Sequence, residues 1–137
     1  MKRIFLIVGL LTVLLLLSAI SLSCTETIEA SLGQEFTLPA GQTAVISGES
    51  LSFKFVEVTG DSRCAKGVEC VWAGEAKCLM LIKYLKSISS VVFTQSGGSV
   101  SQEVFNQYKV SFKLEPYPEA GKQIAASDYK LVMTVTK

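Results

Sequence analysis

Residues 108–118 read Tyr-Lys-Val-Ser-Phe-Lys-Leu-Glu-Pro-Tyr-Pro, and this stretch is the clearest indication of the fold. Its apolar residues alternate with polar residues from position 108 to position 115, which is the period of a β-strand with one buried face. Pro116 and Pro118 then end the strand, because proline has no N–H to donate to a neighbouring strand. The stretch therefore predicts a half-buried strand that stops at a proline-containing loop.

The segments on both sides of this stretch repeat the same pattern. Residues 129–136 alternate in the same way, so we expect the chain to end in a strand, with one short helical turn at 124–127 before it. Residues 91–94 and 100–105 predict two further strands on the N-terminal side. Ser96-Gly97-Gly98-Ser99 lies between them as a flexible turn, which predicts that these two strands form a hairpin.

The first half of the domain also consists of short strand-like segments. Residues 36–38 and 43–46 are separated by Pro39-Ala40-Gly41-Gln42, which predicts a turn. In residues 51–55 apolar and polar side chains alternate. Glu57 then occupies a position where this alternation predicts an apolar residue, so we expect a β-bulge near 55–57. Residues 77–84 are the most hydrophobic segment after the N-terminal run, and residues 79–82 are apolar on both faces, which indicates either a central strand or a strand covered twice.

About seven short strands with turn signals between them predict an all-β fold. No segment after the N-terminal hydrophobic run shows a convincing helical period. The expected architecture is one antiparallel β-sandwich over residues 35–137, immunoglobulin-like in general shape, with a small barrel as the alternative. A chain of 137 residues is long enough for one such domain.

The N-terminus predicts export. Met1-Lys2-Arg3 is a short basic region, residues 4–17 are almost purely apolar, and the run ends at Cys24. This layout predicts a hydrophobic signal helix over residues 1–23 and resembles a bacterial lipoprotein signal. Cys24 would then receive a diacylglycerol, with palmitate as an expected acyl chain, and residues 24–34 would form the lipidated N-terminus and a tether.

Two other outcomes for this segment stay open. Residues 4–23 are long enough to span a membrane as an uncleaved anchor. An ordinary signal peptidase could also release the domain. In all three cases the domain lies outside the cytoplasm, and our expectation is a lipid anchor in the cell membrane or the outer membrane.

A second distinctive stretch, residues 61–76, contains the only tryptophan and two of the four cysteines. The spacing of Cys64 and Cys70 suits a disulfide that closes a small loop in an oxidising compartment. Trp72 is expected to pack as a lid over the disulfide and the end of the core. The alternative to a binding role is that the loop only caps the domain. The candidate interaction residues of this loop are Asp61, Arg63, Lys66, Glu69, Trp72 and Glu75.

Cys78 is left over if Cys24 is lipidated and Cys64 pairs with Cys70. We expect a buried free thiol that behaves as a small hydrophobic side chain. Pairing of Cys78 with Cys64 or Cys70, or with another molecule, is the alternative.

The same stretch resembles a known signature. Asp61-Ser62-Arg63-Cys64 and Val68-x-Cys70-x-Trp72-Ala73-Gly74-x-Ala76 are similar to a pattern in small exported prokaryotic lipoproteins of uncharacterised function. Those proteins usually have proline where this chain has Ala65. The segments 108–118 and 128–131 resemble the C-terminal pattern of the same group. The resemblance implies an exported β-domain and no known activity.

Composition narrows the function classes. The chain has no histidine, so Ser-His-Asp and Cys-His catalytic arrangements are excluded, and no phosphate-binding glycine loop is present. We therefore expect no enzyme, no cofactor and no metal site. Removing Lys2 and Arg3 with the signal leaves 11 basic and 12 acidic residues, which does not favour a nucleic-acid partner.

The remaining expectation is a non-enzymatic binding module at the cell envelope. Its partners would be the membrane, through the N-terminal lipid, and an extracytoplasmic protein or small ligand. One alternative is a protease inhibitor that presents the disulfide loop with Arg63 or Lys66 as the exposed specificity residue. Another is a structural component of the envelope.

Overall fold

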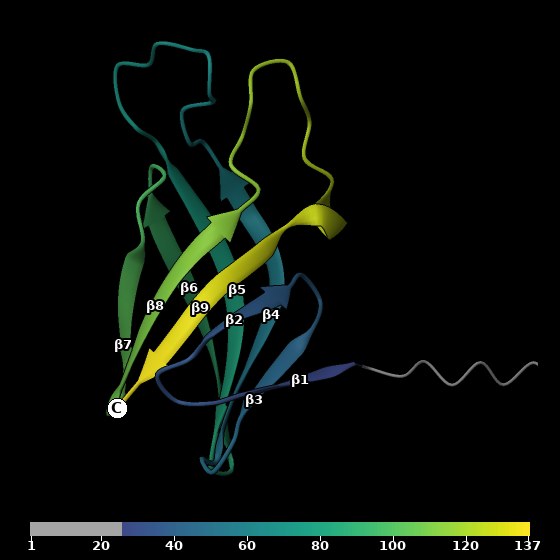
Figure 1. Cartoon of the computed structure of the whole chain (residues 1–137), viewed down its shortest axis with the longest axis vertical. Coiled ribbons are helices and arrows are strands. Elements are labelled where there is room, and N and C mark those ends of the chain that lie inside the picture. The colour runs from purple at the N-terminus through teal and green to yellow at the C-terminus, as the bar shows by residue number, and fades with distance from the viewer. Residues whose placement is uncertain (1–25) are drawn as a thin grey trace, which may run out of the picture.

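A computed structural model describes residues 26–137, and these residues form two β-sheets (Figure 1). The signal segment 1–23 and Cys24 lie outside the described residues. There are nine strands rather than about seven in the described part. They are β1 (Thr27–Ala30), β2 (Glu35–Pro39), β3 (Thr43–Ile46), β4 (Leu51–Asp61), β5 (Glu75–Tyr84), β6 (Ser87–Ser96), β7 (Ser101–Phe105), β8 (Tyr108–Glu115) and β9 (Lys130–Thr136).

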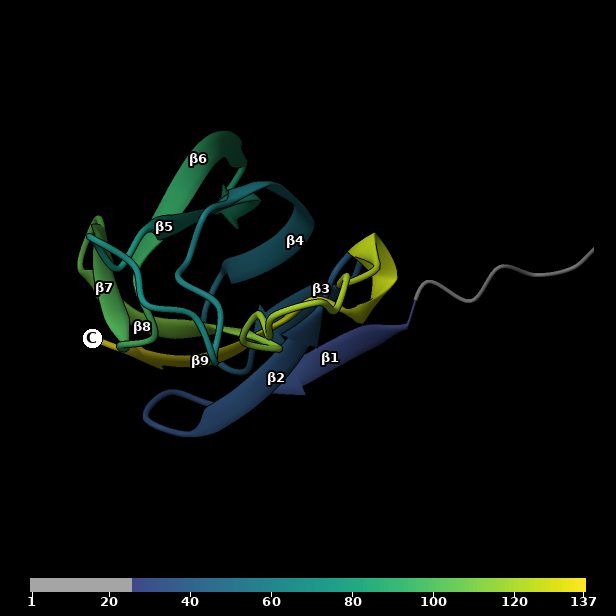
Figure 2. The same ribbon diagram turned by 90° about the horizontal axis from the view of Figure 1, so that it is seen from above.

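The all-β prediction is confirmed, and the arrangement is consistent with a β-sandwich. One sheet has the order β1-β3-β4-β5-β6 and the other has the order β2-β9-β8-β7. Neighbouring strands are antiparallel except for β1, which runs parallel to β3. Seen from above, the two sheets enclose the space between them (Figure 2). The hydrophobic core fills that space, with buried side chains from both sheets.

The sheet begins inside the segment that the sequence assigned to a tether. Residues 27–30 form β1, whose register pairs Thr27 with Thr43 and Ala30 with Ile46. Ala30 is buried against the core. A four-residue strand has too few positions to show a period, so only its backbone pairing with β3 identifies it. Within the described residues the first strand of the domain thus begins at Thr27, so the boundary at residue 35 is wrong.

The alternation in 108–115 predicts the buried face of β8 correctly. Tyr108, Val110, Phe112 and Leu114 are all at most 1% exposed, and the residues between them face outward or are half-buried. The ring of Phe112 lies 4.9 Å from the ring of Phe93 on the opposite sheet, measured between centroids. This contact joins the two sheets at the centre of the core.

Strands β4 and β5 also follow the sequence. The expected bulge is present, because the register between β4 and β5 shifts between Phe55 and Glu57. β5 is a central strand, with β4 on one side and β6 on the other. Its outward residues Leu79 and Leu81 stay partly exposed, so the second alternative, a strand covered twice, does not hold.

The predicted hairpin at residues 96–99 is wrong. β6 belongs to one sheet and β7 to the other, so this turn crosses between the sheets. Gly97 N–H donates to the carbonyl of Gly74 at 2.9 Å, which holds the turn against the residue just before β5. The expected helical turn exists as the short 3₁₀ helix Ala126–Asp128, two residues later than predicted. No helix in the described part is long and apolar enough to cross a membrane.

Cys78 is buried on β5 and unpaired, as expected. Burial raises the pKa of its thiol to about 12. The thiolate is therefore absent at neutral pH, which fits a side chain that only packs.

Candidate functional site

The connection between β4 and β5 forms a long loop at one end of the molecule, drawn in teal at the top of Figure 1. Its base continues the antiparallel pairing of the two strands. Ser62 N–H donates to the Glu75 carbonyl at 2.8 Å, and Cys64 N–H donates to the Ala73 carbonyl at 2.8 Å. The loop is therefore anchored on both strands before it turns.

The predicted disulfide between Cys64 and Cys70 is present. It closes the outer part of the loop, which we call the stapled loop and define as residues 64–72. Gly67 sits at the turn with φ of +85°, a conformation that glycine adopts without steric cost.

A second loop braces the stapled loop from the side. Lys66 N–H donates to the Pro118 carbonyl at 2.9 Å, and Ala120 N–H donates to the Lys66 carbonyl at 3.1 Å. These bonds form a short parallel bridge between Lys66 and Glu119. The loop after β8 and the loop after β4 therefore act as one structural unit, although they are far apart in the sequence.

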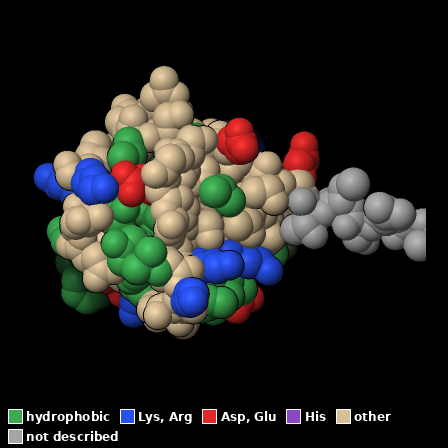
Figure 3. Space-filling view, turned by 90° about the horizontal axis from the view of Figure 1, so that it is seen from below, with side chains coloured by type: hydrophobic (Ala, Val, Ile, Leu, Met, Phe, Trp, Pro, Cys, Tyr) green, Lys and Arg blue, Asp and Glu red, His purple; other side chains and the backbone are tan. Residues whose placement is uncertain are grey.

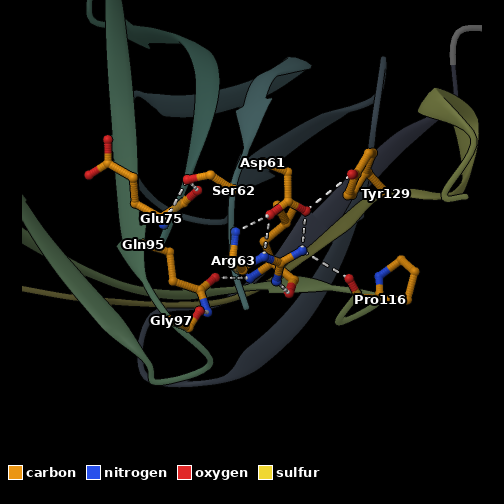
Figure 4. A network of polar contacts seen from close by, with 9 residues as sticks. Asp61, Ser62, Arg63, Glu75, Gln95, Gly97, Pro116 and Tyr129 are labelled. Carbon is orange, nitrogen blue, oxygen red and sulfur yellow. Dashed lines mark hydrogen bonds and ion pairs between the residues drawn. The ribbon is translucent and has the colours of Figure 1, made fainter. Parts of the chain in front are cut away.

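Arg63 lies beneath both loops and joins them (Figure 4). Its Nε and Nη2 donate to the two carboxylate oxygens of Asp61 at 2.8 and 2.6 Å. Its Nη1 donates to the Leu114 carbonyl at 2.8 Å, and Nη2 also donates to the Pro116 carbonyl at 3.0 Å. Tyr129 O–H donates to the same carboxylate at 3.1 Å. A planar guanidinium with five donors suits this number of acceptors, whereas lysine could not reproduce it.

This network corrects the expectation that Arg63 is exposed. The residue is only 5% exposed, and its charged group is already bonded to Asp61 and to two carbonyls. Burial acts to raise the pKa of Asp61, but the hydrogen bonds and charge of Arg63 outweigh burial, so this pKa is lowered. Asp61 and Arg63 therefore support the loop rather than face a partner.

Gln95 and Tyr117 complete the brace, and the candidate loop residues did not include them. Gln95 is fully buried, and its Oε1 accepts from the Leu114 N–H at 2.6 Å while its Nε2 donates to the Gly97 carbonyl at 3.2 Å. Gln95 lies two positions after Phe93, so the alternation of the strand places both side chains on the same inward face. This spacing was the signal in the sequence that could have identified Gln95. Tyr117 covers Arg63, with the guanidinium carbon 5.2 Å from the ring centroid.

The expectation that Trp72 packs as a lid is wrong. Trp72 is 80% exposed and its neighbour Val71 is 97% exposed, while Val68 on the same loop is 51% exposed. The reason is its position: Trp72 lies beyond the backbone bond from Cys64 to Ala73, past the last buried core residue of β5, Ala76. The indole therefore lies outside the core, and the stapled loop presents three apolar side chains, Val68, Val71 and Trp72, to solvent.

The six candidate residues thus lie in three different places. Lys66 and Glu69 are exposed together with Trp72, whereas Asp61 and Arg63 are below the surface. Glu75 lies at the loop base and forms an ion pair with Lys77 at 3.0 Å. A cavity of about 190 Å³ is lined by Gly60, Asp61, Ser62, Glu75 and Lys77.

Exposed hydrophobic side chains also occur at the other end of the molecule. Figure 3 shows that end, where hydrophobic side chains lie among lysines and acidic residues. Leu85, in the turn between β5 and β6, is 61% exposed. Exposure alone therefore does not single out the stapled loop, but the covalent closure and the buried brace beneath it do.

Comparison with known proteins adds no assignment. No protein-family model matches the chain, and no curated protein or solved structure matches it either. The function must therefore be argued from the site itself.

Proposed function

We propose that the chain is an exported, lipid-anchored, non-enzymatic module that binds a protein partner through the tip of the stapled loop. The observation that carries this proposal is the exposure of Val71 and Trp72, at 97% and 80%, on a loop held by a disulfide and a buried ion pair. Tryptophan is among the residues most often found to dominate binding energy at protein interfaces.

Rigidity supports the same conclusion. Binding a flexible loop costs conformational entropy, and a loop already fixed in shape loses less on binding. The stapled loop is fixed by its disulfide, by Arg63 and by the bridge from Lys66 to Glu119.

The chemistry of the tip favours a protein over a small molecule. Small ligands usually bind in concave sites, whereas Val71 and Trp72 project from the loop. Lys66 and Glu69 are exposed on the same loop and supply polar groups around the apolar pair. An apolar centre with a polar rim is the usual composition of a protein interface.

The anchor is part of the proposal. A disulfide between Cys64 and Cys70 is compatible with an oxidising, extracytoplasmic location. If Cys24 carries the lipid, only three positions separate it from Thr27, where β1 begins. Three extended residues span about 10 Å, so the domain would lie directly beside the membrane.

We also propose an immunoglobulin-like sandwich as the finer description of the fold. Domains of this kind commonly use the loops at one end of the sandwich for recognition.

Two features argue against the inhibitor alternative. Arg63 cannot serve as the exposed specificity residue, because it is buried. Lys66 is exposed, but its main-chain N–H and carbonyl are already bonded to Pro118 and Ala120. A protease that binds its inhibitor through main-chain hydrogen bonds would find these groups occupied.

The test is affinity capture from detergent-solubilised envelopes with the full-length chain as bait. Trp72→Ala and Val71→Ser should each lose the partner while their melting curves stay unchanged, because both side chains are exposed. Val104→Ser on β7 is the matched control, since Val104 is also exposed, at 74%, but lies away from the loop.

The captured partner must then bind the purified chain directly. Loss of a central tryptophan should weaken that binding by about thirtyfold, or about 2 kcal/mol. Equal capture by the unmodified bait and by both tip variants would remove the loop from the function. A partner lost only from the Val104 variant would place recognition on another surface.

A further inference from the structure

The four edge strands of the described sheets differ in how they are protected against pairing with other chains. Natural proteins commonly protect an edge with a charged residue, a proline or a very short strand. β1 has four residues and contains Glu29, β2 contains Glu35 and Pro39, and β7 contains Glu103. β6 has ten residues, Ser-Ile-Ser-Ser-Val-Val-Phe-Thr-Gln-Ser, with neither a charge nor a proline.

β6 also has a free edge. It is the last strand of its sheet, and among the described strands β5 is its only hydrogen-bonded neighbour (Figure 2). The backbone N–H and carbonyl groups on its other side therefore face away from the sheet and have no strand partner. Such a row of groups is a template for adding another strand.

The outer face of β6 is apolar at two positions that suit self-pairing. Ile88 is 67% exposed and Val92 is 47% exposed, and Ser90 lies between them on the same face. On the neighbouring strand Leu79 is paired with Val92 and is itself partly exposed. The free edge is therefore bordered by an apolar surface.

We propose that β6 pairs antiparallel with β6 of a second copy of this chain. The two-fold axis passes between the Ser90 residues of the two copies. In this register Ile88 of each copy lies opposite Val92 of the other, and the two Ser90 side chains face each other. Next to Val92, on β5 of the same copy, lies Leu79, so Ile88, Val92 and Leu79 form one apolar row across the three strands. Directly opposed apolar and hydroxyl pairs of this kind stabilise an antiparallel sheet.

A second copy fits this edge better than a charged peptide does. β6 has no charge to select such a peptide, and pairing with itself places no like charges opposite each other. The nearest charges on β5 are Lys77 and Lys83, which pair with Thr94 and Ile88, and Lys86 lies in the turn just before β6. In the proposed register Lys86 of one copy falls opposite Thr94 of the other, with Lys77 one strand further away, so no two lysines are directly opposed. Lys83 lies next to Ile88 of its own copy, and the row across that Ile88 ends at Leu79 of the other copy. The two Lys83 side chains are therefore in different rows and do not meet.

The geometry is compatible with two anchored copies. A two-fold axis keeps every residue at the same height along the axis in both copies, so the two β1 strands, at which the described residues begin, stay on the same side. Pairing also uses up the exposed β6 edge of each copy, which closes the assembly at two. The two stapled loops then point in opposite directions, so this interface does not involve the site proposed above.

The test is a charge exchange at Ser90, which is exposed, in the full-length chain. Two differently tagged copies are co-expressed and solubilised, and one tag is captured. Ser90→Lys alone and Ser90→Glu alone should each lose co-capture, because like charges then face each other across the axis. Co-expression of the Lys variant with the Glu variant should restore it. The control is Thr37→Lys, at an exposed residue of β2 in the other sheet, and it should leave co-capture unchanged.

A second measurement keeps the proposal decisive if pairing is weak. Directly opposed Cβ atoms in antiparallel strands lie about 4.5 to 5.5 Å apart, close to the spacing that a disulfide tolerates. Ser90→Cys should therefore give a crosslinked dimer on a non-reducing gel, whereas Thr94→Cys, far from its counterpart in this register, should not.

The outcomes separate clearly. Unchanged co-capture by both single-charge variants, with no crosslink from Ser90→Cys, would overturn the β6 interface, and so would crosslinked species larger than a dimer. Trp72→Ala should not affect either measurement, so failure of this proposal and failure of the proposed loop function are distinguishable.

Discussion

Arg63 Nη1 lies 2.8 Å from the carbonyl oxygen of Leu114, a residue 51 positions later in the chain. This bond ties the start of the stapled loop to the end of β8, in the opposite sheet. The same guanidinium is paired with Asp61, so one side chain connects two sheets and two loops. The position of the loop on the sandwich therefore depends on a buried charge.

Replacing Arg63 with alanine should lower the free energy of unfolding by about 3 kcal/mol, because it leaves Asp61 without its counter-charge in a largely buried position. Urea unfolding of the full-length chain in detergent measures the loss. Lys66→Ala changes a charge on the same loop but at an exposed position, and should cost less than about 0.5 kcal/mol. Equal effects of the two substitutions would contradict a supporting role for Arg63.

The Asp61–Arg63 pair should also make stability depend on acid pH. The pKa of Asp61 is lowered below 3.8 in the folded chain, so the unfolded chain takes up the proton first as the pH falls. The contribution of this carboxylate is complete above the unfolded pKa and disappears as the pH falls through the lower folded pKa. The stability difference between the native chain and Asp61→Asn should therefore be largest near neutral pH and shrink below about pH 4. A difference independent of pH would argue against the ion pair.

Gly74 is required where the loop returns to β5. Its φ is +68°, and a Cβ atom would lie 1.9 Å from the carbonyl oxygen of Ser62, which belongs to the rigid loop base. Gly121 has a similar φ of +75°, but a Cβ atom there would meet nothing within 4 Å. Gly121→Ala should therefore cost only the backbone strain, about 1 to 2 kcal/mol, and Gly74→Ala clearly more. Thermal unfolding compares them, and similar losses would mean that the loop base can shift.

Removing the disulfide with Cys64→Ser and Cys70→Ser together should lower the free energy of unfolding by about 2 kcal/mol, because the loop it closes is short. A differential scanning calorimetry trace of the double variant gives this value. The same variant should also weaken partner capture, since the tip would lose its fixed shape. An unchanged melting curve with full capture would show that the Arg63 brace alone fixes the loop.

The sequence predicted the fold where a strand was long enough to show its period. In 108–115 every second side chain is apolar, and the buried face of β8 follows directly. The bulge in β4 was also readable, because Glu57 interrupts an otherwise apolar phase. β1 could not be found in this way, since four residues do not define a period and the strand exists through its pairing with β3.

The sequence was less informative about the loop. It identified the Cys64–Cys70 pair, because a short disulfide loop depends on local spacing. It misplaced Trp72 and Arg63, because general preferences put tryptophan inside and arginine outside. In the folded chain Asp61, Leu114 and Pro116 together supply enough acceptors to bury the arginine, whereas the indole lies past the end of the core.

The sequence by itself determined the all-β class, the faces of the long strands and the disulfide loop, since these follow from alternation and from contacts between near neighbours. Only the tertiary structure decided which strands share a sheet, that β6 has a free and uncharged edge, and which loop residues are buried. Those features depend on groups that meet across large distances in the sequence, such as Arg63 with Leu114, and local patterns carry no record of such meetings.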